Sequence, residues 1–293
     1  RDLHSFPTRR SSDLSFVAIT HGDTNGIGYE LILKAFENPA MLELCTPIIY
    51  GSPKVASFHR KALELETPYV VINNAEDAQD GKLNLLATFE EEVKVEFGQS
   101  TEESNEAARK AVQRAKEDLQ KHLYDVLVMS PVKSNPNPAR EDKSLLVMIS
   151  NIVRIGLVTN HLPLKDLPQA ITAEKIIDKC RIFNTSLKRD FRINNPRIAV
   201  LALNPQMGTE ENNVILPAVE TLEKEGLLAF GPYVADTFFG ENLYEQFDGV
   251  LAMYDDQGAV PFKTLSTEYG VKMKAGITAI CTTPDQDPSF DIS

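Results

Sequence analysis

The chain has 293 residues, of which 42% are hydrophobic and 25% are charged, a composition typical of a globular protein with a substantial core. Its formal net charge of −12 argues against nucleic acid as the main partner, because binding phosphate backbones needs a basic face. No apolar run approaches the roughly 20 residues that a membrane-spanning helix needs, so we expect no membrane partner either.

The cysteines indicate a reducing compartment. Cys45, Cys180 and Cys281 are scattered along the chain and form no Cys-x-x-Cys pair. This pattern predicts no disulfide framework, and we therefore expect a cytoplasmic protein.

Both ends of the sequence are abrupt. Residues 1–14 are polar and lack a hydrophobic period, so we expect a non-native segment there and a first strand beginning at Ser15. The last residues, 290–293, stop within what reads as a structured segment, so we expect the natural protein to be longer.

Hydrophobic periodicity predicts strands that alternate with helices. The expected strands cover residues 16–20, 47–50, 69–72, 125–129, 155–159, 197–203 and 249–254. The expected helices cover residues 29–36, 100–122, 171–184 and 210–225, with another after Pro53. This alternation predicts a mostly parallel α/β sheet with helices on both faces. We expect a first domain over residues 15–129, joined by the C-terminal end of the chain, and a second over 130–285, with the loop 133–140 as the junction.

Polar clusters follow several of these strands, where open α/β sheets bind their ligands. The clusters cover residues 21–25, 130–133, 160–161, 204–206 and 254–257. Several polar strand ends in one chain favour an enzyme or a ligand-binding protein over a structural role.

The first cluster opens a glycine loop with the pattern Gly22-x-x-x-Gly26-x-Gly28. It lacks the Gly-Lys-Ser/Thr of a phosphate-binding P-loop and the spacing of a dinucleotide fingerprint. One interpretation is that its backbone N–H groups and the following helix N-terminus bind an anion. The other is a tight turn with close helix packing.

The later strand ends carry chemically useful side chains, each with a simpler structural explanation. His161 is either a metal ligand or a surface histidine. Asp255 and Asp256, followed by Gln257, either hold a hard divalent metal through oxygen or cap a helix. Lys263 is either a phosphate or carboxylate ligand or an ordinary exposed lysine.

Taken together, these segments resemble the 4-hydroxythreonine-4-phosphate dehydrogenase family. The resemblance runs from about Ser15 to the end of the chain and is carried by residues 19–30 (ITHGDTNGIGYE), 130–132 (SPV), 158–164 (VTNHLPL), 201–205 (LALNP), 231–237 (GPYVADT), 253–258 (MYDDQG) and 261–263 (PFK).

The resemblance implies NAD-dependent oxidation of 4-phosphooxy-L-threonine, followed by loss of carbon dioxide to give 3-amino-2-oxopropyl phosphate for pyridoxal 5′-phosphate biosynthesis. It implies a two-domain fold like that of the isocitrate and isopropylmalate dehydrogenases, without a Rossmann fingerprint. The implied assembly is a homodimer whose subunits share the site. A divalent metal (Zn, Mg, Mn or Co) would polarise the hydroxyl, and NAD would accept the hydride.

The family's site residues carry over only in part. His161 matches the first of three metal-binding histidines, whereas Gln206 and Asp255 stand where the other two are expected. The resemblance thus gives metal ligands His161, Asp255 and Gln206; catalytic residues Asp236, Asp256 and Lys263; and substrate or cofactor ligands Gly22, Asp23, Asn25, Gly26, Gly28 and Lys263.

Further departures also fall on polar site positions. The family's Gly-His-Thr motif is missing between Lys133 and Glu141, Lys272 and Cys281 replace an asparagine and an arginine, and residues 286–287 read Gln-Asp instead of His-Gly. Losing imidazoles weakens a transition-metal site, while the oxygens of Gln206 and Asp255 suit a harder ion such as Mg²⁺.

Three hypotheses follow. The chain is a dehydrogenase acting on the family's substrate or a related phosphorylated hydroxy acid; a non-catalytic homologue that serves as a binding or dimer-partner subunit; or an altered copy with no selected role.

Overall fold

The computed structural model describes residues 14–89, 93–132, 144–266, 270–277, 279–284 and 289. The chain divides into two compact units, one of residues 1–134 with 286–293 and one of residues 135–285. The sequence placed the division at 129/130. The expected non-native segment up to residue 13, the shortened loop 133–141, the Gln-Asp pair at 286–287 and the chain end at 290–293 lie outside the described residues.

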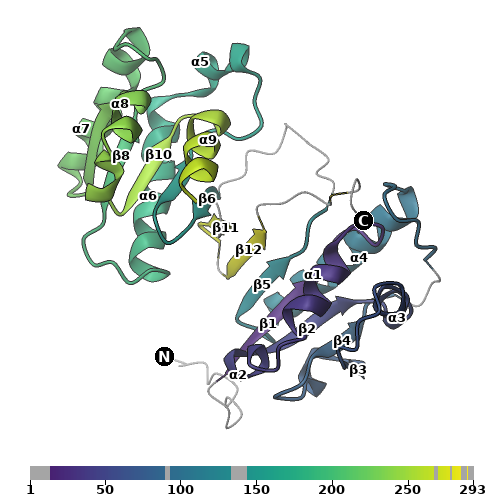
Figure 1. Cartoon of the computed structure of the whole chain (residues 1–293). Helices are drawn as coiled ribbons and strands as arrows, with labels where there is room; N and C mark the ends of the chain where they lie inside the picture. Colours follow the sequence, from purple (N-terminus) through teal and green to yellow (C-terminus); the bar gives the residue numbers. More distant parts are fainter. Residues whose placement is uncertain are drawn as a thin grey trace. The chain divides into compact units, whose positions relative to one another are not determined.

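The first unit is a parallel α/β layer. Its strands are β1 (Ser15–Thr20), β2 (Cys45–Gly51), β3 (Val70–Ile72), β4 (Asn84–Ala87) and β5 (Val126–Met129). They lie in the order β3-β4-β2-β1-β5, with every neighbouring pair parallel (Figure 1). The helices are α1 (Gly28–Ala35), α2 (Met41–Leu44), α3 (Pro53–Ala62) and α4 (Glu102–Gln120), with a 3-10 turn, η1, at Ala75–Asp77.

Helices cover both faces of this sheet. One core joins β1, β2 and β4 to the apolar sides of α1 and α3, through residues such as Ile49 and Leu33. On the other face, the buried alanines of α4 let that helix approach β1 and β2 closely. Thr101 caps α4 by accepting the backbone N–H of Ser104 at 3.1 Å, which fixes where the helix begins.

The second unit combines parallel and antiparallel strands. They are β6 (Leu145–Ile149), β7 (Arg154–Leu157), β8 (Arg197–Leu201), β9 (Leu228–Tyr233), β10 (Gly249–Ala252), β11 (Val271–Ala275) and β12 (Ile280–Pro284). Their order is β12-β11-β6-β7-β10-β8-β9. The four strands from β7 to β9 are mutually parallel, whereas β6, β11 and β12 pair antiparallel.

Helices also cover both faces of the second sheet. They are α5 (Leu167–Ala170), α6 (Ala173–Arg189), α7 (Leu216–Lys224), α8 (Ala235–Gly240) and α9 (Asp255–Leu265), with 3-10 turns η2 (Leu164–Asp166) and η4 (Leu243–Gln246) and a π-helical turn η3 (Glu211–Ile215). Phe183 of α6 and Leu222 of α7 belong to the core on one face. Phe238 of α8 and Phe262 of α9 belong to the core on the other.

The mostly parallel α/β architecture predicted from the sequence is confirmed. Several element bounds differ from expectation, and two of the differences bear on the candidate site. The strand predicted to reach Tyr254 ends at Ala252, and Asp255 is the first residue of α9, next to the helix-cap position that was one of its two interpretations. The helix predicted over 210–225 opens with the π-helical turn η3 before α7.

Among the described residues, no helix is both long enough and apolar enough to cross a membrane.

Candidate functional site

The carboxyl ends of four neighbouring strands form one edge of the second unit. Because β7, β10, β8 and β9 are parallel and adjacent, the residues that follow them emerge at the same side of the sheet. His161 follows β7, Asp255 and Asp256 follow β10, Gln206 follows β8 and Asp236 follows β9. The topology thus brings most of the expected catalytic and metal-binding residues to one edge.

His161 and Asp255 are in direct contact there. The backbone N–H of His161 donates to Asp255 Oδ2 at 2.6 Å, and His161 Nδ1 lies 3.9 Å from Asp255 Oδ1. His161 has a backbone φ of 55°, in the left-handed region. Its side chain is 69% exposed, so the ring faces solvent beside a carboxylate.

Two further side chains connect the strand ends. Gln257 accepts the N–H of Met253 through Oε1 at 2.7 Å and donates from Nε2 to the carbonyl of Ala202 at 2.6 Å. Thr159 donates its hydroxyl to the Met253 carbonyl at 2.7 Å. These side-chain-to-backbone hydrogen bonds link the ends of β7, β10 and β8.

Glu211, at the start of η3, lies near the end of β8 and was not among the site residues expected from the sequence. Its fully buried carboxylate accepts the backbone N–H groups of Leu203, Asn204 and Gly208 at 2.8–2.9 Å. Burial acts to raise the pKa of Glu211, but these hydrogen bonds stabilise its charge and leave the pKa below its ordinary value. Nothing in the local pattern identified it, since an acidic residue at the start of a helix is commonplace.

The metal ligands expected from the resemblance are only partly assembled. In the described ranges, no three His, Cys, Asp or Glu side chains gather as a metal site. Asp255 already accepts a backbone N–H, and Gln206 is an exposed amide that makes no hydrogen bond within those ranges. One imidazole and one carboxylate do not fit a transition-metal centre, which takes at least three strong ligands.

The remaining expected catalytic residues lie on helices. Asp236 is exposed in the first turn of α8, and its Oδ1 accepts the N–H of Thr237 at 2.5 Å. Asp256 and Lys263 are exposed on α9, seven residues apart and therefore on one face of the helix. Lys263 follows Asp255 by eight residues, about 12 Å along the axis at 1.5 Å per residue, so the two mark opposite ends of α9.

The glycine loop lies in the first unit and is buried throughout. A Cβ on Gly28 would meet the carbonyl oxygen of His21 at 2.0 Å, and one on Gly22, where φ is 76°, would meet that of Pro131 at 2.5 Å. These glycines are thus required by their own neighbouring backbone. This geometry supports the interpretation of a tight turn with close packing.

Asn25 fastens the same loop to the segment before α4. Its side chain donates to the carbonyl of Gln99 at 2.8 Å and accepts the N–H of Glu96 at 2.9 Å. The backbone N–H of Asn25 in turn bonds to Asp23 Oδ1 at 2.9 Å. The expected ligand-binding residues of the loop thus have structural partners inside the unit.

His21 is a second residue whose role the sequence left open. It is fully buried, stacks on Tyr29 with ring centroids 5.1 Å apart, and meets the edge of Phe89. Neither ring nitrogen makes a hydrogen bond of normal geometry in the described part of the chain, although the backbone of Ala107 and Gly22 lies near enough to act on the pKa of the ring. Burial lowers the pKa of His21 to about 4, so the ring is neutral at pH 7.

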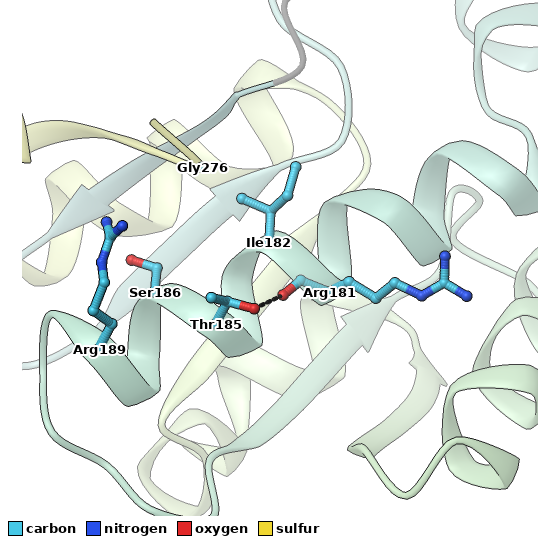
Figure 2. Close-up of a pocket in the computed structure, with 6 residues that line it drawn as sticks. All are labelled: Arg181, Ile182, Thr185, Ser186, Arg189 and Gly276. Atoms are coloured by element: carbon cyan, nitrogen blue, oxygen red, sulfur yellow. Dashed lines mark hydrogen bonds between the residues drawn. The ribbon is translucent and has the colours of Figure 1, made fainter. Parts of the chain in front are cut away.

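A small hollow of about 190 Å³ lies along α6 in the second unit (Figure 2). Its lining comprises Arg181, Ile182, Thr185, Ser186, Arg189 and Gly276. Arg181 pairs with Glu225, and Arg189 pairs with Asp190. None of the expected site residues lines it, so the strand-end edge remains the candidate site.

Comparison with known proteins agrees with the fold and the motif order. The chain is 43% identical to a 4-hydroxythreonine-4-phosphate dehydrogenase of Bacteroides thetaiotaomicron over 300 aligned residues, covering 94% of this chain and 82% of the relative. It is 33% identical to the enzyme of that name from a Sulfurihydrogenibium species, covering 94% and 91%. The crystal structure of a 4-hydroxythreonine-4-phosphate dehydrogenase from Burkholderia phymatum superposes with a TM-score of 0.79 at 27% identity, covering 96% and 92%.

The family model described as pyridoxal phosphate biosynthetic protein PdxA matches residues 43–139 and 137–293. The chain therefore belongs to this family, as its strand-end motifs indicated, and its relatives are oxidoreductases of pyridoxal phosphate biosynthesis.

Proposed function

We propose that this chain oxidises the hydroxyl of 4-phosphooxy-L-threonine with NAD and releases carbon dioxide, giving 3-amino-2-oxopropyl phosphate. The observation that carries the proposal is the shared edge of β7, β10, β8 and β9, where His161, Asp255, Asp256 and Asp236 emerge together. Family membership and 43% identity over 94% of the chain support the choice of substrate.

The chemistry proceeds in two balanced steps. The carbon-bound hydrogen leaves as hydride to NAD and the hydroxyl gives up its proton, so the alcohol becomes a ketone. The product is a β-keto acid, whose carboxylate leaves as carbon dioxide. The resulting enolate then takes a proton to give the aminoketone phosphate.

The protein's part is orientation and proton handling. Lys263 supplies a positive charge suited to the phosphate or carboxylate of the substrate. The carboxylates of Asp236 and Asp256 are exposed at this edge, and in this proposal they accept the proton from the hydroxyl or return one to the product. From the resemblance alone, we also propose that the Gly22–Gly28 loop contributes to substrate or cofactor binding, besides its packing role in the first unit.

His161 and Asp255 by themselves do not make a transition-metal centre. If the reaction needs a metal, the oxygen atoms of Asp255 and Gln206 favour a hard ion such as Mg²⁺. Such an ion would take oxygen ligands from the protein and the substrate together. The proposed assembly is a cytoplasmic homodimer that shares the site between subunits.

The test is NADH absorbance with the purified full chain, 4-phosphooxy-L-threonine and NAD. Reactions run in EDTA and with added Mg²⁺, Mn²⁺, Zn²⁺ or Co²⁺, beside a panel of related phosphorylated hydroxy acids. Asp236→Asn and Asp256→Asn should each lower kcat by roughly 10²-fold or more if they handle the proton. Folded protein that forms no NADH with any acid under any condition would refute the proposal.

The second candidate is a non-catalytic binding or dimer-partner subunit. It is favoured by the incomplete ligand set, because Gln206 and Asp255 stand where the family's imidazoles are expected. Calorimetric titration separates the two functions. Binding of NAD or the substrate without turnover supports this candidate, whereas NADH formation removes it.

A further inference from the structure

The contact between His161 and Asp255 has the geometry of a structural cross-link. Asp255 is the first residue of α9, where a carboxylate is favoured by the helix dipole. From there Oδ2 accepts the backbone N–H of His161 at 2.6 Å. His161 has a φ of 55°, a left-handed conformation that a non-glycine residue keeps only when its surroundings fix it. The hydrogen bond to Asp255 helps to fix this conformation.

The adjoining strand ends are tied in the same way. Gln257 connects the backbone at Met253 to that at Ala202, and Thr159 also bonds to Met253. Together these hydrogen bonds link the ends of the three neighbouring strands β7, β10 and β8. Each is a protein hydrogen bond between 2.6 and 2.7 Å.

Glu211 completes the arrangement on the β8 side. Its carboxylate accepts three backbone N–H groups from residues 203–208, the loop that carries Gln206. The Asn204 side-chain amide donates to the same carboxylate at 3.2 Å. Both carboxylate oxygens of Glu211, and Oδ2 of Asp255, therefore already accept hydrogen bonds.

We propose that Asp255 is a cross-linking residue, and that hydrogen bonds from Asp255, Gln257, Thr159 and Glu211 hold this edge together without a resident transition metal. Of the Asp255 carboxylate, only Oδ1, 3.9 Å from His161 Nδ1, is left to meet an ion, and one imidazole with one carboxylate oxygen gives too few ligands for a transition metal. The inference goes beyond the proposed function and does not depend on turnover.

The first test measures the thermal midpoint, Tm, of the full chain by calorimetry, in EDTA and then with Zn²⁺ or Mg²⁺, without substrate. We expect the same Tm in all three, whereas an ion present at roughly 100 times its Kd would raise Tm by several degrees. The matched control is His122→Gln, since His122 is also exposed and has φ of 56°. A metal-dependent rise that survives in His122→Gln but vanishes in Asp255→Asn would overturn the inference.

The second test measures amide hydrogen exchange at His161. Asp255→Ala removes the acceptor and should speed exchange there by on the order of tenfold, while Asp255→Asn keeps an acceptor oxygen and should have a much smaller effect. Unchanged exchange in Asp255→Ala would contradict the cross-link. Both measurements use protein without substrate, so a chain that fails to form NADH can still satisfy them, and an active chain can still fail them.

Discussion

Gln257 and Ala202 are 55 residues apart in the sequence, yet the Gln257 side chain donates to the Ala202 carbonyl at 2.6 Å. The same amide accepts the N–H of Met253, so one side chain satisfies polar groups at the ends of two neighbouring strands. This relationship makes Gln257 part of the framework that supports the candidate site.

We expect Gln257→Ala to lower the free energy of unfolding by about 2 kcal/mol, since it leaves a backbone N–H and a carbonyl without their partners. Urea unfolding followed by circular dichroism measures this change. The control is Gln206→Ala, an exposed glutamine on the same edge, which should stay within about 0.5 kcal/mol of wild type. Equal effects of the two substitutions would contradict the assignment.

Glu211→Ala should destabilise the second unit by about 3 kcal/mol, because three backbone N–H groups lose a buried charged acceptor. The pKa of Glu211 is lowered in the fold, so its contribution is present above the unfolded pKa of about 4.3 and is lost as pH falls through the lower folded value. Unfolding curves at successive pH values should show this acid-dependent loss in wild type. A Glu211→Ala protein with the same acid dependence would disprove it.

His21 should make the first unit sensitive to mild acid. Its folded pKa of about 4 lies below the unfolded value of 6.5, so the unfolded chain binds more protons between these values. The free energy of unfolding should therefore be highest above pH 6.5. It should fall by about 3 kcal/mol toward pH 4, at 1.36 kcal/mol per pKa unit. In His21→Leu the part of the pH slope due to this ring should vanish.

His59 provides the comparison for that experiment. Burial lowers its pKa as well, but its Nε2 lies 2.8 Å from the Thr24 carbonyl oxygen. Part of the residual slope in His21→Leu should therefore come from His59, and the slope should shrink further in the double variant. A slope unchanged by His21→Leu would show that this ring does not govern the acid response.

Gly28→Ala distinguishes the two interpretations of the glycine loop. If close packing demands the glycine, the added Cβ at 2.0 Å from the His21 carbonyl oxygen should cost about 3 kcal/mol or more, or prevent folding. Gly240→Ala is the control, because a Cβ there meets nothing within 4 Å and alanine is the better helix former. A Gly28→Ala protein of normal stability that has lost NAD binding would instead support ligand approach.

The sequence by itself determined the class of fold and the places where chemistry is expected. Alternating strand and helix periods predicted the parallel α/β layers, because side-chain periodicity reports which faces are buried. Motifs such as Thr159-Asn160-His161 and Met253-Tyr254 pointed to the right strand ends, although β7 and β10 each end two residues earlier than predicted. The strand order was not accessible from these local patterns.

Only the tertiary structure decided which polar groups are already engaged. From its sequence position Asp255 could be a metal ligand or a helix cap, and its bond to the His161 N–H exists because β7 and β10 are neighbours. In the sequence Glu211 resembles any acidic residue near the start of a helix. In the structure it is buried beside the 203–208 loop and accepts that loop's backbone N–H groups. Such roles depend on contacts between residues far apart in the chain, which no local pattern encodes.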